Sequence, residues 1–122
     1  MSDEIAKQFD NALTRTIDMR AGYKSAVDSL RANIRAAAEL GMSQRKLDAK
    51  AARKAEAEMT AMVDASVALV LEQAREGVAK MMEKEMGGGA VCPPSLVPDV
   101  ALTPFIGIYE AKALGGIKAA FA

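Results

Sequence analysis

Apolar side chains spaced three and four residues apart run through the first 86 residues and favour long helices. Between residues 3 and 40 these positions are Ile5, Phe9, Leu13, Ile17, Tyr23, Val27, Leu30, Ile34 and Leu40. The spacing places them along one stripe of an α-helix. The stripe has a gap between Ile17 and Tyr23, at the same place as Gly22. We expect a bend there, or the close approach of another backbone.

A second helix is predicted from residue 43 to residue 86, because no proline or glycine interrupts the chain between Ser43 and Gly77. Its apolar stripe includes Met59, Met62, Leu69 or Val70, Ala74, Val78 and Met81. Gly41 is expected to end the first helix in a left-handed conformation. So short a link predicts two antiparallel helices, a helical hairpin over residues 1–86.

The remaining residues form two further segments. Gly87-Gly88-Gly89 breaks the second helix, and three prolines between residues 93 and 98 favour an extended arm over residues 87–103. Residues 104–122 are apolar and interrupted by glycine, and they predict a short C-terminal helix that docks on its own hairpin or on a neighbour. The predicted fold class is therefore all-α.

The residue types exclude most catalytic and metal sites. The chain has no histidine and one cysteine, so it cannot form a Ser-His-Asp or Cys-His site, or a zinc site built on imidazole. Glu72 and Glu76 would share a helix face, but an acid–base site needs carboxylates that converge from facing helices. We expect a protein that is not an enzyme and uses no cofactor, metal or small-molecule substrate.

Apolar residues fill five consecutive positions, 67–71, and therefore point all around the second helix. One neighbouring helix cannot cover every side, so this belt predicts contact with further chain or with another copy. Together with apolar residues of the two segments that follow, 87–103 and 104–122, the belt forms the predicted oligomer interface: Val67, Leu69, Val70, Leu71, Leu96, Val97, Phe105, Ile106, Ile108, Leu114 and Phe121. Cys92 could add a disulfide between copies.

Positive charge gathers around the expected turn between the two helices. Residues 31–54 carry seven Lys and Arg side chains against two carboxylates, although the whole chain has zero formal net charge. Arg45 and Lys46 oppose the dipole of the predicted second helix, which indicates a negatively charged partner. The predicted contacts with such an acidic partner are Arg31, Arg35, Arg45, Lys46, Lys50, Arg53 and Lys54.

These features predict a structural subunit of a homo-oligomeric assembly, for example a virion head–tail or collar component or part of a secretion-type rod. One alternative is a small regulatory or inhibitor protein that binds nucleic acid or an acidic protein surface through the basic residues. A second is a membrane-active protein that uses its C-terminal tail. The acidic N-terminus does not resemble a signal peptide. We therefore expect the chain to be cytoplasmic when synthesised and then incorporated into a virion or other assembly.

Overall fold

The computed structural model describes residues 2–121 and confirms that the fold is all-α. Three helices, α1 (Ser2–Ser43), α2 (Ala49–Met86) and α3 (Thr103–Ala120), account for most of the chain. Two short 3-10 helices, η1 (Pro94–Leu96) and η2 (Asp99–Leu102), lie between α2 and α3. No strand occurs in the described range.

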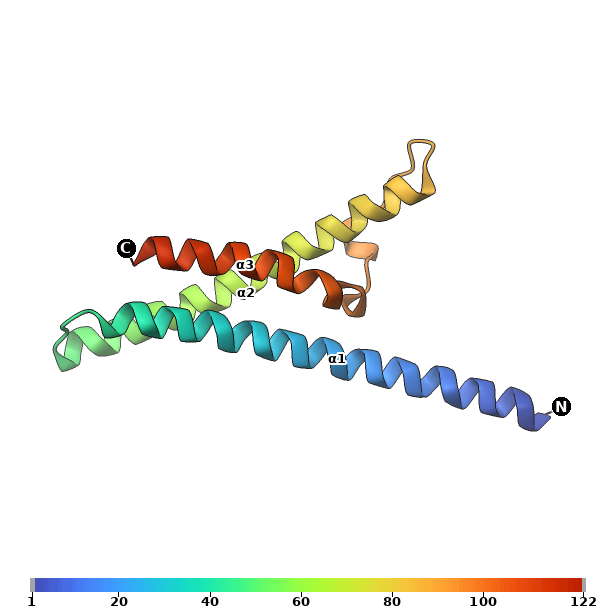
Figure 1. Ribbon diagram of the computed structural model, residues 1–122, viewed down its shortest axis with the longest axis horizontal. Helices are drawn as coiled ribbons and strands as arrows, with labels where there is room; N and C mark the ends of the chain where they lie inside the picture. Colours follow the sequence, from blue (N-terminus) through green and yellow to red (C-terminus); the bar gives the residue numbers. More distant parts are fainter. Residues whose placement is uncertain (1, 122) are drawn as a thin grey trace.

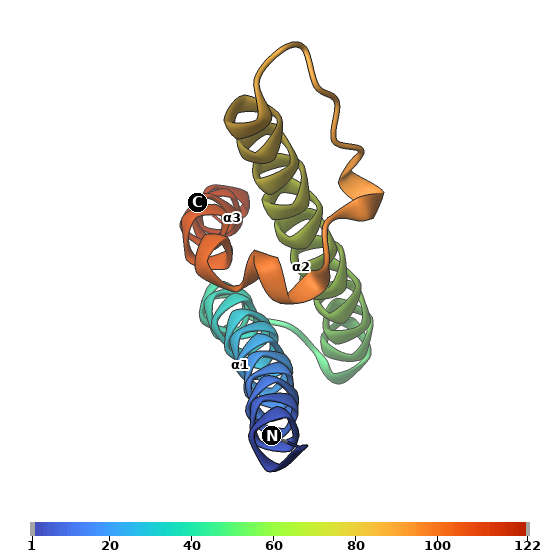
Figure 2. The same ribbon diagram turned by 90° about the vertical axis from the view of Figure 1, so that its right-hand side faces the viewer.

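The two long helices diverge from the turn that joins them. Figure 1 shows α1 and α2 separating like the arms of a V, and α3 running back toward the turn alongside both. Figure 2, turned by 90°, shows α3 next to both α1 and α2. Contacts among α1, α2 and α3 hold together the packed part of the protein, called here the body. Within it α1 packs against α3 as well as against α2. The body is therefore a three-helix arrangement, with α3 beside both long helices.

The turn differs from the predicted Gly41 stop. Gly41 is helical, α1 continues to Ser43, and α2 begins only at Ala49. The carboxylate of Asp48 caps α2 by accepting a hydrogen bond of 2.7 Å from the backbone N–H of Ala51. Gly41 is needed for a different reason, because a Cβ at this position would lie only 2.9 Å from the Cβ of Phe121 and closer still to its ring.

The segment between α2 and α3 is only partly extended. Gly87–Gly89 follow α2 with φ angles of 67°, 62° and 76°, which glycine adopts at little cost. The prolines then lead into η1 and η2, where an extended path was expected. Arg75 on α2 fixes this segment by donating to the carbonyl oxygen of Val97 and to the carboxylate of Asp99.

The core lies where the three helices and η2 meet. The sequence correctly places Leu30 and Ile34 of α1, and Ala74 and Val78 of α2, among the buried residues. Leu102 of η2 is fully buried, and η2 contacts all three helices. The amide of Asn33 also donates a 2.8 Å hydrogen bond to Glu110 and so ties α1 to α3. Several residues of the predicted stripes are instead exposed: Ile5, Phe9, Leu13, Ile17, Leu40 and Met81.

Two glycines of α1 should respond oppositely to alanine. Gly22→Ala is expected to raise the free energy of unfolding by up to about 1 kcal/mol, because the exposed helix gains propensity and the new methyl meets no atom within 4 Å. Gly41→Ala is expected to lower it by about 1–2 kcal/mol, because the methyl displaces Phe121. Urea unfolding of both variants measures the difference. An equal increase in the free energy of unfolding for both variants would show that Phe121 can pack on α1 without a glycine at position 41.

Candidate assembly interface

The apolar belt of α2 is largely covered by the chain's own residues. Val67 and Val70 are buried in the protomer, and so are Val97 and Ile106 of the C-terminal part. Four more predicted interface residues are half-buried against the same core: Leu71, Phe105, Leu114 and Phe121. These eight side chains stabilise the protomer. Only Leu69, Leu96 and Ile108 of the predicted interface are exposed.

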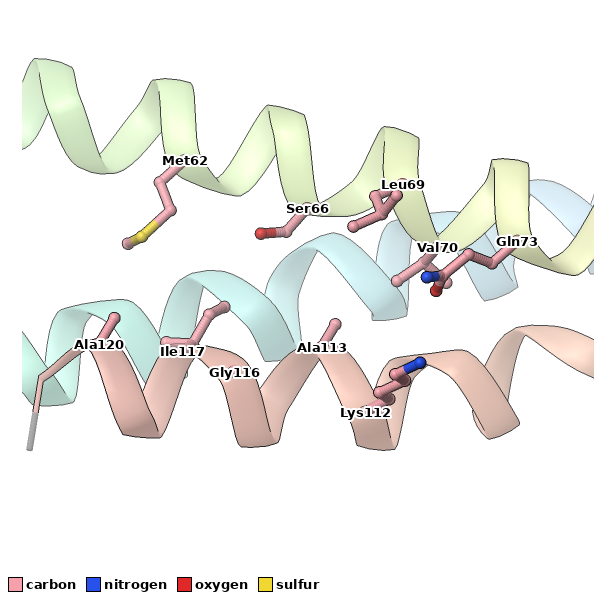
Figure 3. Close-up of a pocket in the computed structure, with 10 residues that line it drawn as sticks. All are labelled: Met62, Ser66, Leu69, Val70, Gln73, Lys112, Ala113, Gly116, Ile117 and Ala120. Atoms are coloured by element: carbon pink, nitrogen blue, oxygen red, sulfur yellow. The ribbon is translucent and has the colours of Figure 1, made fainter.

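A shallow apolar groove of about 310 Å³ remains between α2 and α3. Figure 3 shows Met62, Ser66 and Leu69 on its α2 side, facing Gly116 and Ala120 of α3. Gln73 and Lys112 lie at one end and add polar side chains to the Ser66 hydroxyl. Gly116 leaves room because it has no side chain. The groove keeps part of the belt accessible, with Leu69 52% exposed.

The N-terminal half of α1 carries a run of exposed apolar side chains. Every described side chain from residue 3 to residue 22 is exposed, and this stretch, called here the α1 arm, projects beyond the body (Figure 1). Phe9 is 70% exposed, and Ile5, Leu13 and Ile17 are exposed by half or more. These four residues recur every fourth position and share one face of the helix. Most of the stability of helices in proteins comes from packing of an apolar face, and this face of the arm is not packed within the protomer.

The arm residues were predicted to belong to the packed stripe of the first helix, and not to form a separate surface. The gap between Ile17 and Tyr23 was the available signal, because burial on α1 begins at Tyr23. The gap marks where the helix leaves the body. At Gly22 itself the helix continues, and no other backbone comes close.

A second groove lies at the base of the α1 arm, where the arm meets η2. It is lined on α1 by Met19, Arg20 and Tyr23 and on the other side by residues 98–100, and it has a volume of about 540 Å³. Burial raises the pKa of the Tyr23 phenol, and the nearby Asp99 carboxylate raises it further while Arg75 lowers it. The groove therefore combines apolar side chains and a protonated hydroxyl with two charged residues, Arg20 and Asp99. We call it the arm-base groove.

Two of the seven predicted acidic-partner contacts are used within the chain. Arg31 pairs with Asp64, and Arg35 lies 3.0 Å from Glu39 and 3.7 Å from Glu56. The other five have no salt bridge among the described residues: Arg45, Lys46, Lys50, Arg53 and Lys54. Arg45 instead lies 5.1 Å from the ring centroid of Phe121. These five residues, called the basic cluster, are all exposed.

Cys92 is buried, and its backbone N–H donates a 2.8 Å hydrogen bond to the Glu83 carboxylate. A disulfide to another copy would therefore require this segment to move first. Within residues 2–121, no group of three or more His, Cys, Asp or Glu side chains is arranged to hold a metal ion. In the same range, no helix combines the length and hydrophobicity that crossing a membrane requires.

Comparison of the chain with protein-family models, with curated protein sequences and with solved structures finds no match.

Proposed function

We propose that this protein is a non-enzymatic structural subunit that assembles into a homo-oligomer, in a setting such as a virion or a secretion-type rod. The observation that carries the proposal is the α1 arm, which leaves Ile5, Phe9, Leu13 and Ile17 uncovered on one helix face. A contiguous apolar surface of this kind is typical of a protein–protein contact. Burying it would also supply the packing from which most helix stability in proteins comes.

The contrast between a packed body and an unpacked arm supports an assembly role. The body buries its apolar residues between three helices, whereas the arm has no buried side chain. The exposed residues of the predicted belt and tail, Leu69, Leu96 and Ile108, are further apolar side chains outside the arm that are free for contacts. A subunit with two separate surfaces can contact more than one neighbour, as rings and filaments require.

The proposal predicts that the chain is oligomeric and that arm substitutions make it monomeric. Phe9→Gln with Leu13→Gln keeps good helix formers and removes two exposed apolar side chains that the protomer does not pack. We expect light scattering across a concentration series to give the mass of one chain for this variant and a multiple of it for the native chain. Circular dichroism should show that the variant keeps the helices of the body, with any loss of helix content limited to the uncovered arm.

Leu69→Gln with Ile108→Gln is the matched control, because it removes two apolar side chains of similar exposure from the body. If only this control lowers the mass, the body surface is the interface and the arm is not. A native chain that stays monomeric at every concentration and salt condition would refute the assembly proposal.

The basic cluster supports a second candidate function, binding to nucleic acid or to an acidic protein surface. Its five side chains are exposed without a described ion pair, and three of them, Lys50, Arg53 and Lys54, lie at the start of α2. If nucleic acid is the ligand, binding should weaken as salt increases, because counterions are released from phosphates. Replacing all five by glutamine should abolish binding in a fluorescence-anisotropy titration at low salt. No binding by the native chain would exclude nucleic acid as the partner.

A further inference from the structure

Charge is distributed unevenly along the α1 arm and the two residues of α1 that follow it. Residues 3–10 carry three carboxylates, Asp3, Glu4 and Asp10, and one cation. Residues 15–24 carry three cations, Arg15, Arg20 and Lys24, and one carboxylate. The apolar residues lie across both halves. One helix therefore has an acidic end, a basic end and a continuous apolar face.

We propose that the α1 arm binds the α1 arm of a second copy in antiparallel orientation, forming a two-fold symmetric contact. This inference rests on the proposed assembly function and specifies the partner of its main surface. In an antiparallel pair the acidic half of each arm faces the basic half of the other, so the charges are complementary twice. A parallel pair would bring acidic residues against acidic residues and basic against basic, which is unfavourable.

The apolar residues specify where the two arms cross. Ile5, Phe9, Leu13 and Ile17 form a single i, i+4 row, and such rows interdigitate when two helices cross at about 50°. The middle of the row, between Phe9 and Leu13, is the point of closest contact. Two copies of the row then cover each other, which gives these four exposed side chains an apolar environment.

The arm-base groove fits the end of the partner's arm. With the crossing between Phe9 and Leu13, Ile5 of one copy lies opposite residues 17–21 of the other, next to the groove lined by Met19 and Tyr23. The same register places Asp3 and Glu4 opposite residues 18–19 of the partner, next to Arg20 but also beside Asp18, the one carboxylate of the basic half. The contact is isologous, and it closes after two copies. Any larger assembly must use the body surface in addition.

Distances between spin labels on the two copies show whether the two arms are antiparallel or parallel. Asn11 and Ser25 are exposed, lie 14 residues apart on α1, and are not among the four residues of the apolar row. Each would be changed to cysteine in the full chain, with Cys92→Ala removing the native thiol. In an antiparallel pair the Ser25 labels should be farther apart than the Asn11 labels by roughly 15 Å or more, from the helix rise and the crossing angle. A parallel pair should give nearly equal distances, and that result would overturn the inference.

Charge reversal gives an independent test of the complementarity. Asp3→Lys with Glu4→Lys should raise the dimer dissociation constant several-fold, since it replaces two carboxylates by two lysines opposite the basic half of the partner, near Arg20. Adding Arg20→Glu and Lys24→Glu to the same chain should return the dissociation constant to its native value, because opposite charges then meet again. Restoration cannot come from the helix dipole, because the lysines at the N-terminus remain.

The outcomes separate this inference from the assembly proposal. An oligomer with equal label distances, or one that charge reversal does not weaken, refutes antiparallel pairing and leaves the assembly function standing. A native chain that is monomeric at every concentration refutes both. A longer Ser25 distance together with loss and restoration by charge establishes the antiparallel arm contact.

Discussion

Leu102→Ala is expected to lower the free energy of unfolding by about 2–5 kcal/mol, a large part of the roughly 5–15 kcal/mol available to a small domain. Leu102 is 0% exposed and belongs to η2, which contacts α1, α2 and α3. Removing its branched side chain leaves a cavity that three separate helices would all have to close. The Ala-rich helices around it supply few large side chains that could move into the space.

Leu96→Ala is the matched control, because Leu96 lies six residues earlier in the same segment and is 72% exposed. We expect this substitution to change stability by less than about 0.5 kcal/mol. Urea unfolding followed by circular dichroism compares the two variants. Equal effects would mean that η2 does not join the three helices, and that the core is held by α1 and α2 alone.

The local features of the fold were predictable from the sequence. The three- and four-residue spacing of apolar side chains identifies long helices without any knowledge of the rest of the chain. Leu30, Ile34, Ala74 and Val78 were placed in the stripes and are buried. The exposure of the basic cluster is what lysine- and arginine-rich segments normally show.

The partners of each face were not predictable, because they depend on contacts between distant residues. Val67 and Val70 indicated correctly that something must cover the belt, but the periodicity does not say whether α3 or another copy does so. Ile5 and Leu30 look equivalent in the sequence, yet one is exposed and the other buried. The role of Gly41 likewise depends on Phe121, which lies 80 residues away in the chain.

Ending the chain at Leu102, which removes α3, is expected to abolish cooperative unfolding. Ile106 and Ile117 are buried in α3, and five further side chains that this truncation removes are partly buried against the core: Phe105, Tyr109, Ala113, Leu114 and Phe121. Without them α1 and α2 expose the sides that α3 covers, including Val70. Exposed apolar surface of this kind should bind a hydrophobic dye and promote aggregation.

A chain that begins at residue 19 is the matched control for this truncation, because it loses a helical stretch of similar length in which no described side chain is buried. We expect it to retain a cooperative transition with a Tm within a few degrees of the native value, and to be monomeric. Differential scanning calorimetry and light scattering on both chains make the comparison. Cooperative unfolding without α3 would mean that the two long helices form an independent hairpin. Loss of cooperativity without the arm would mean that the arm stabilises the protomer. The expected pair of results instead separates a three-helix body that folds by itself from an arm whose apolar face serves contacts between copies.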